Sequence, residues 1–117
     1  METTTTTPTL AFTMAECIDR CLAGFRECEV NVPRSVDKGH AVEHVRLLLD
    51  CAEICRASAG FLMRESEHHA LICNVCAQLC EDCAQSCLAF HGDVDLERCA
   101  DVCQTCVESC RAMASAH

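Results

Sequence analysis

The stretch CNVCAQLCEDCAQSC, from Cys73 to Cys87, carries five cysteines spaced 3, 4, 3 and 4 residues apart. Because an α-helix turns about 100° per residue, this spacing places all five thiols within a stripe about 80° wide. The residues between them are mostly polar and fall on the rest of the helix surface. This is the pattern of the buried positions in a helix bundle, with thiols where leucine is usual. A row of thiols on one face is a set of soft ligands, so the stretch predicts binding of a soft metal ion.

The remaining nine cysteines repeat this periodicity in three other segments. Those of residues 17–28 and 51–55 each fall within about 40°, and those of residues 99–110 within about 60°. Every cysteine of the chain therefore lies on a stripe predicted to face inward. The candidate metal ligands are Cys17, Cys21, Cys28, Cys51, Cys55, Cys73, Cys76, Cys80, Cys83, Cys87, Cys99, Cys103, Cys106 and Cys110.

Four helices are needed to position these stripes. We expect one helix from Pro8 or Thr9 to Glu29, a second from Ser35 or Asp37 to about Arg64, and a third from Ser66, a good N-cap, to about Phe90. A fourth should begin near Asp93 or Asp95, with Pro33 ending the first segment and Gly92 the third. Links of a few residues predict an all-α, antiparallel up-down-up-down four-helix bundle with a cysteine-lined core. We expect residues 1–8 to be a disordered tail and 9–117 a single domain.

Three further features of the sequence concern how the helices meet. Gly24 falls on the first cysteine stripe, which predicts close approach of a neighbouring helix. Val42, Val45 and Leu49 form an apolar patch opposite the inward face of the second helix, which suggests contact with another subunit. At one end of the bundle the helix connections would gather His40, His44 and His91 near Cys28, Cys87 and Cys99. The other end would gather Met14, Leu62, His69 and Met113.

Composition limits the classes of partner and compartment. The formal charge of −9 disfavours nucleic acid and anionic lipid, and no apolar run approaches the length that spans a membrane. The N-terminal residues METTTTTPTL have neither the charged nor the apolar region of a secretory signal. We therefore expect a cytoplasmic protein, in a compartment where disulfides are uncommon.

Several chemistries could account for 14 inward cysteines. Inert packing explains one buried thiol well, but not all of them. Disulfides could join facing helices, whereas cysteines four residues apart in one helix are poorly placed to bond each other. The usual iron–sulfur runs are absent. Zinc would require discrete sites of about four ligands.

Cu(I) fits the pattern best because it accepts two or three soft ligands. Many buried thiolates would be costly without compensating charge, and one Cu(I) per thiolate cancels that charge. The metal-free thiols would stay protonated, so metal uptake should release protons. Capacity should approach about one Cu(I) per cysteine on charge neutrality. Imidazoles at His40, His44 and His91 could pass Cu(I) between an external donor and the thiols.

Non-storage functions have weaker support. Glu65-Ser66-Glu67-His68 matches one E-x-x-H string of a di-iron enzyme, but at a predicted helix junction and without a second copy. Zinc signalling or thiol redox chemistry would favour one privileged cysteine. We expect a non-enzymatic store that exchanges copper with chaperones or copper enzymes.

The C-x3-C pairs in every predicted helix, with CNVCAQLCEDCAQSC and CADVCQTCVESC, resemble the bacterial copper storage proteins, and the N-terminus resembles their cytosolic branch. The resemblance implies a four-helix bundle that forms a homotetramer and stores many Cu(I) ions in each chain. It also implies an opening near the last helix connection that is marked by histidines, here His91, with His40 and His44 as spatial candidates. Cytosolic members often carry more cysteines, and His40, His44 and Leu48 occupy positions where thiols could stand.

Overall fold

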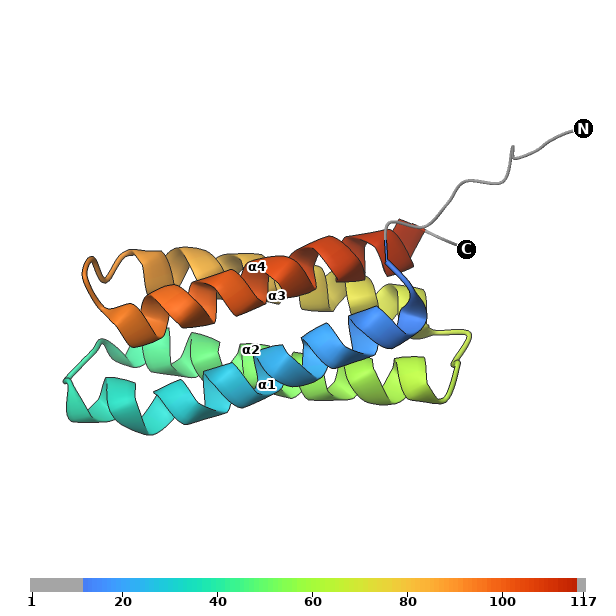
Figure 1. Ribbon diagram of the computed structural model, residues 1–117. Coiled ribbons are helices and arrows are strands. Elements are labelled where there is room, and N and C mark those ends of the chain that lie inside the picture. The colour runs from blue at the N-terminus through green and yellow to red at the C-terminus, as the bar shows by residue number, and fades with distance from the viewer. Residues whose placement is uncertain (1–11, 116–117) are drawn as a thin grey trace, which may run out of the picture.

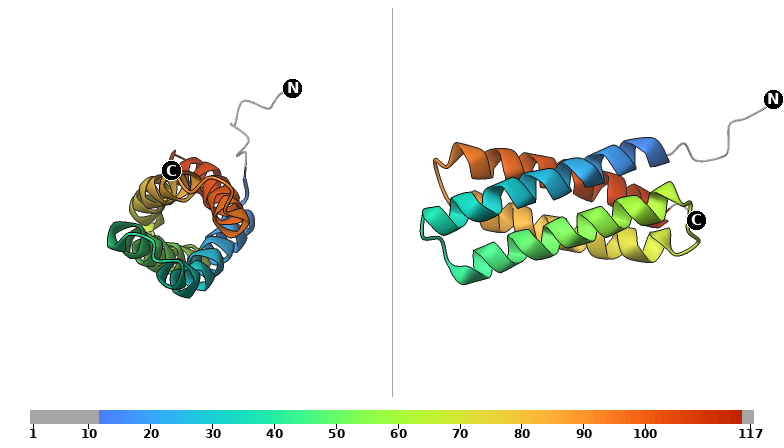
Figure 2. Two further views of the ribbon diagram at one scale, coloured as in Figure 1. Left: turned by 90° about the vertical axis from the view of Figure 1, so that its left-hand side faces the viewer. Right: turned by 90° about the horizontal axis from the view of Figure 1, so that it is seen from below.

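Four helices surround one axis in the computed structural model, which describes residues 12–115 (Figures 1 and 2). They are α1 (Met14–Asp37), α2 (Val42–Met63), α3 (His69–Leu88) and α4 (Val94–Ser115). Successive helices run in opposite directions, and α1 also packs against α4, so the bundle closes into a ring. The predicted antiparallel four-helix bundle is confirmed. The tail predicted at residues 1–8 lies outside the described residues.

The first helix begins later than the sequence predicted. Phe12 and Thr13 are not helical, and α1 begins at Met14 rather than near Pro8 or Thr9. The cause is a capping box: the Glu16 N–H donates to Thr13 Oγ1 at 3.1 Å, and the Thr13 N–H donates to Glu16 Oε1 at 2.8 Å. This reciprocal pair fixes the first turn of a helix.

The prediction that Pro33 ends the first helix was wrong. Helix α1 continues through Pro33 to Asp37, so Ser35 and Asp37 close this helix instead of opening α2. Proline removes only one backbone donor, whose acceptor would be the carbonyl of Glu29. Both Pro33 and Glu29 lie on the exposed face, where water can satisfy that carbonyl, while Asn31 and Ser35 hold the buried face against the bundle.

Helix α3 begins at His69, three residues after the predicted N-cap. The Ser66 hydroxyl does bond a backbone donor, since it accepts the His68 N–H at 3.0 Å, but this bond lies in the turn that precedes the helix. The Glu65–His68 string lies in the same connection, where Glu65 has a φ of 52°.

Two loops, residues 38–41 and 89–93, lie together at one end of the bundle, here called the mouth (Figure 1). Lys38 Nζ donates to Asp93 Oδ2 at 2.8 Å and so joins them. Each loop contains a glycine with positive φ, 73° at Gly39 and 82° at Gly92, a conformation that side chains disfavour. The other end, here called the far end, holds the α2–α3 loop.

Across residues 12–115, no helix combines the length and the apolar character needed to cross a membrane.

Candidate metal centre

The interior of the bundle is lined with thiols. All 14 cysteines are free and each has a relative exposure of 0%. The inward stripes predicted from the 100° period are therefore confirmed. Alanines such as Ala52 and Ala84 fill the spaces beside the thiols, and Leu48, Leu62, Leu96 and Met113 are the largest side chains buried with them.

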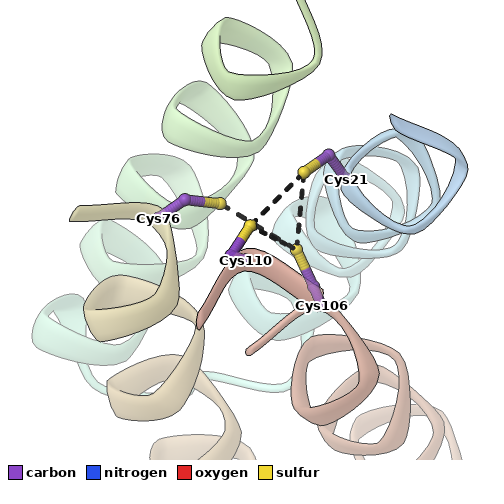
Figure 3. Close-up of side chains that lie close together, drawn as sticks. All are labelled: Cys21, Cys76, Cys106 and Cys110. Carbon is purple, nitrogen blue, oxygen red and sulfur yellow. Dashed lines mark hydrogen bonds between the residues drawn. The ribbon is translucent and has the colours of Figure 1, made fainter. Parts of the chain in front are cut away.

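All the thiols except those of Cys51 and Cys87 fall into four compact groups, and the sulfur atoms within each group lie within 4.8 Å of one another. Figure 3 shows one of them, in which thiols from α1, α3 and α4 point toward one another. The groups are Cys21, Cys76, Cys106 and Cys110; Cys28, Cys83, Cys99 and Cys103; Cys55, Cys76, Cys80 and Cys106; and Cys17, Cys73 and Cys110. Three cysteines belong to two groups each, so the groups are not separate sites.

The sulfur atoms also form an unbroken path along the axis. The path runs from Cys17, toward the far end, to Cys99 at the mouth, and no step exceeds 4.0 Å. In order, its steps join Cys17, Cys110, Cys106, Cys76, Cys80, Cys51, Cys103, Cys28 and Cys99. Since a metal–thiolate bond is about 2.3 Å long, two sulfurs on one ion lie at most about 4.6 Å apart. The spacing along this path suits ions that bridge neighbouring thiolates.

Protonation of this core follows from its burial and from the contacts among its thiols. Hydrogen bonds that these thiols donate to neighbouring sulfurs, and then burial, raise the pKa of Cys28, Cys80 and Cys110 above the ordinary value. The pKa of Cys51 is lowered, first by its hydrogen bond with Cys103. Thiols with raised pKa stay protonated at neutral pH, so a metal ion must displace their protons.

Two histidines and an aromatic ring meet at the mouth. The Phe90 ring stacks on His40, with centroids 4.0 Å apart, and lies 4.7 Å from the His44 ring. The two imidazoles are 5.6 Å apart at an angle of 72°. His44 is buried, with 4% relative exposure, and its Nδ1 lies 2.7 Å from Ser86 Oγ.

The contacts of His44 suit it to hold a metal ion. Burial, and then the charge of His40, lower the His44 pKa below its ordinary value, so the neutral imidazole is favoured. Among residues 12–115, His44 Nε2 has no hydrogen-bond partner. When His44 Nδ1–H donates to Ser86 Oγ, the lone pair of Nε2 is free, which is the usual arrangement of a metal-binding histidine.

The predicted third histidine of the mouth, His91, is exposed in the α3–α4 loop. The ring packed against His40 and His44 is that of the preceding residue, Phe90, which sequence reasoning did not select. It also did not select Ser86, the partner of His44. A signal was present for Ser86, since it lies next to the inward Cys87, but its contact with α2 depends on how the helices are rotated.

The residues expected at the far end differ in how deeply they are buried. Leu62 and Met113 are fully buried, while Met14 and His69 are partly exposed. Ser58 lies 3.5 Å from the Cys73 sulfur and so extends the polar contacts of the thiols there.

Comparison with known proteins agrees with this geometry. The family described as "Csp: Copper storage protein" matches residues 8–115. A curated relative, the "Uncharacterized cysteine-rich protein YhjQ" of Bacillus subtilis (strain 168), is 31% identical over 76 residues, which are 61% of this chain and 68% of that protein.

Two solved structures share the fold, each with a TM-score of 0.81. The Nmul_A1745 protein from Nitrosospira multiformis is 33% identical over 89% of this chain and 96% of its own. A structure described as "Cu(I)-bound Copper Storage Protein BsCsp3" is 30% identical over 87% of this chain and 99% of its own. The family match spans the helices that carry all 14 inward thiols, and this chain therefore belongs to the copper storage protein family.

Proposed function

We propose that this chain stores Cu(I) inside its bundle, with the 14 cysteine thiolates as ligands and many ions per chain. The observation that carries the proposal is the unbroken path of sulfur atoms with shared members. Membership of the copper storage family supports it, as does the Cu(I)-bound state of a relative with the same fold.

The sharing of thiols favours Cu(I) over zinc. A zinc site takes about four ligands of its own, whereas Cys76, Cys106 and Cys110 each belong to two groups. Four thiolates around one Zn²⁺ also leave a net charge of −2 in a dry core, which is costly. One Cu(I) per thiolate leaves none, so we expect a capacity approaching about one ion per cysteine.

The ions pass through the mouth in this proposal. His44 offers a neutral imidazole between the surface and the outermost thiols, and His40 and the exposed His91 are the other candidate ligands. Phe90 covers the two inner imidazoles. A His44→Leu change should slow Cu(I) uptake and lower the final capacity by at most one ion, whereas His68→Leu, in the exposed α2–α3 loop, should leave the rate unchanged. Equal rates in stopped-flow uptake would contradict this route.

The protein acts in this proposal as a non-enzymatic cytoplasmic store that exchanges copper with chaperones or copper enzymes. It also assembles as a homotetramer through the outer face of α2, where Val42 and Leu49 are 57% and 44% exposed. Light scattering should give a mass of four chains, reduced by Leu49→Glu but not by Leu71→Glu on α3. A monomeric wild-type protein would rule out the tetramer.

Anaerobic titration of the reduced protein tests the storage function. Cu(I) is added in competition with a chromophoric chelator, and the ions withheld from the chelator are counted. Storage predicts many tight equivalents per chain. Saturation at one or a few would instead favour a zinc-type site, and a low count of free thiols beforehand would favour a disulfide module.

A further inference from the structure

The line of thiols on α1 is interrupted at one position, Gly24. From residue 17 to residue 28 the buried residues of this helix are Cys17, Cys21, Gly24 and Cys28, at the spacing that α3 and α4 fill with cysteines. Gly24 is buried, so the interruption lies inside the core. The close approach expected at Gly24 is confirmed, and the neighbour is a sulfur atom.

The space beside Gly24 is occupied by the Cys55 thiol of α2. A methyl group built on Gly24 would lie 3.0 Å from Cys55 Sγ, closer than nine in ten real contacts of this kind. Cys55 has little room to give way, because its sulfur is already 3.4 Å from that of Cys80 and 3.9 Å from that of Cys76. Glycine at position 24 therefore allows Cys55 its observed place.

The missing thiol at position 24 affects the make-up of one of the four thiol groups. Three of the four groups include a cysteine of α1, namely Cys17, Cys21 or Cys28. The group at the level of Gly24 contains Cys55, Cys76, Cys80 and Cys106, and takes nothing from α1. At this level α1 supplies room for the sulfur of another helix instead of a sulfur of its own.

We propose that Gly24 is a positioning residue of the metal store: the space it leaves holds Cys55 Sγ where it can share Cu(I) with the Cys76, Cys80 and Cys106 thiolates. This inference rests on the proposed storage function and extends it to a residue without a ligand atom. Because Cys55 has little room to shift, the added methyl group would turn it to another rotamer, which moves its sulfur by more than a metal–sulfur bond can stretch and so removes Cys55 from the group.

Gly24→Ala, Cys55→Ala and the double variant form a cycle that tests this coupling. Each protein is reduced, its free thiols are counted, and its tight Cu(I) equivalents are measured anaerobically alongside its melting temperature without metal. Gly60→Ala on α2 is the matched control, because its added methyl group would meet only the flexible end of Arg64, at 3.3 Å.

The expected result is specific to the presence of the Cys55 sulfur. Gly24→Ala should lose between one and four equivalents, the latter being the size of the group, with its thiol count unchanged. In the Cys55→Ala background the same change should cost no further equivalents. Gly60→Ala should keep the wild-type capacity and melt no lower, because alanine favours a helix more than glycine does.

Two results would overturn the inference: wild-type capacity in Gly24→Ala, or an equal loss with and without the Cys55 sulfur. If Gly24→Ala does not fold, a folded double variant with the capacity of Cys55→Ala supports the inference, and failure of both to fold overturns it. A wild-type protein that binds only one or a few ions would instead refute the storage function itself.

Discussion

Individual thiols in this core differ in how many of the four sulfur groups they belong to. Cys76, Cys106 and Cys110 each belong to two groups of sulfurs, whereas Cys51 belongs to none of the four, although it is equally buried. A thiolate in two groups can bridge ions of both. The loss of a thiol shared by two groups should therefore disturb more sites than the loss of a thiol that belongs to none of them.

We predict that Cys106→Ala lowers the Cu(I) capacity more than Cys51→Ala does. Both changes remove one buried heavy atom, so each should cost a similar free energy of unfolding, about 1 kcal/mol in the metal-free protein. Anaerobic Cu(I) titration compares the capacities, and urea unfolding checks the stabilities. Equal losses of capacity would mean that sharing among the groups has no consequence for storage.

At this scale the sequence predicted which residues face inward but not which of them meet. The 100° period of a helix is a property of one segment, so all 14 cysteines and the close approach at Gly24 followed from it. The meeting of Cys28 with Cys83, Cys99 and Cys103 depends on the height and rotation of separate helices. The same holds for the contacts of His44 on α2 with Ser86 of α3 and with Phe90 of the α3–α4 loop.

The helix ends at the mouth depend on a few polar contacts. Asp93 Oδ1 accepts the Leu96 N–H at 3.1 Å at the start of α4, and Asp93 Oδ2 accepts from Lys38 Nζ. The hydrogen bond from Lys38 is the main cause that lowers the Asp93 pKa below 3.8, followed by the bond from Leu96, while burial opposes both. A carboxylate with a lowered pKa stabilises the fold above its unfolded-state pKa, and this stabilisation is lost as the pH falls through its folded-state pKa.

We predict that Asp93→Ala lowers the free energy of unfolding by about 1 kcal/mol at pH 7, as the loss of a helix cap typically does. Asp93→Asn should lose less, because the amide oxygen can still accept the Leu96 N–H. The difference between wild type and Asp93→Ala should begin to shrink below about pH 4, where the carboxylate of the unfolded chain takes up a proton, and should be lost as the pH falls through the lowered folded-state pKa. Urea unfolding of the metal-free proteins measures both effects, and an unchanged Asp93→Ala would refute the capping role.

The helices were predictable in number and type, and less so at their ends. Asp93 and Gly92 were recognised because a side-chain acceptor and a positive φ are local requirements. The prediction that Pro33 ends the first helix failed because the free energy that a proline costs a helix depends on whether the carbonyl of Glu29 lies in water or in the core. The packing of the four helices decides which of the two applies. Once α1 continued to Asp37, the predicted start of α2 at residue 35 or 37 moved to Val42.

The whole molecule holds its thiols in a dry interior, where those with raised pKa must exchange their protons for metal ions. Thiols with raised pKa, such as Cys28 and Cys80, carry their protons at pH 7. Each Cu(I) that takes a thiolate ligand then expels a proton, and the net charge of the core stays near zero.

We predict the release of about one proton per Cu(I) bound at pH 7, on the thiol-exchange argument. A pH-stat titration of the reduced protein with Cu(I), delivered as its acetonitrile complex, measures this ratio. A ratio near zero would mean that the ions bind to groups already deprotonated, such as imidazoles or surface carboxylates.

The central claim is that Cu(I) binds along the axis between the four helices. The most direct measurement is a crystal structure of the Cu(I)-loaded protein with anomalous scattering recorded at the copper edge. The account predicts a row of copper peaks inside the bundle, each within bonding distance of two or three cysteine sulfurs. Copper found only on the outer surface, or an interior in which the sulfurs are paired as disulfides, would contradict it.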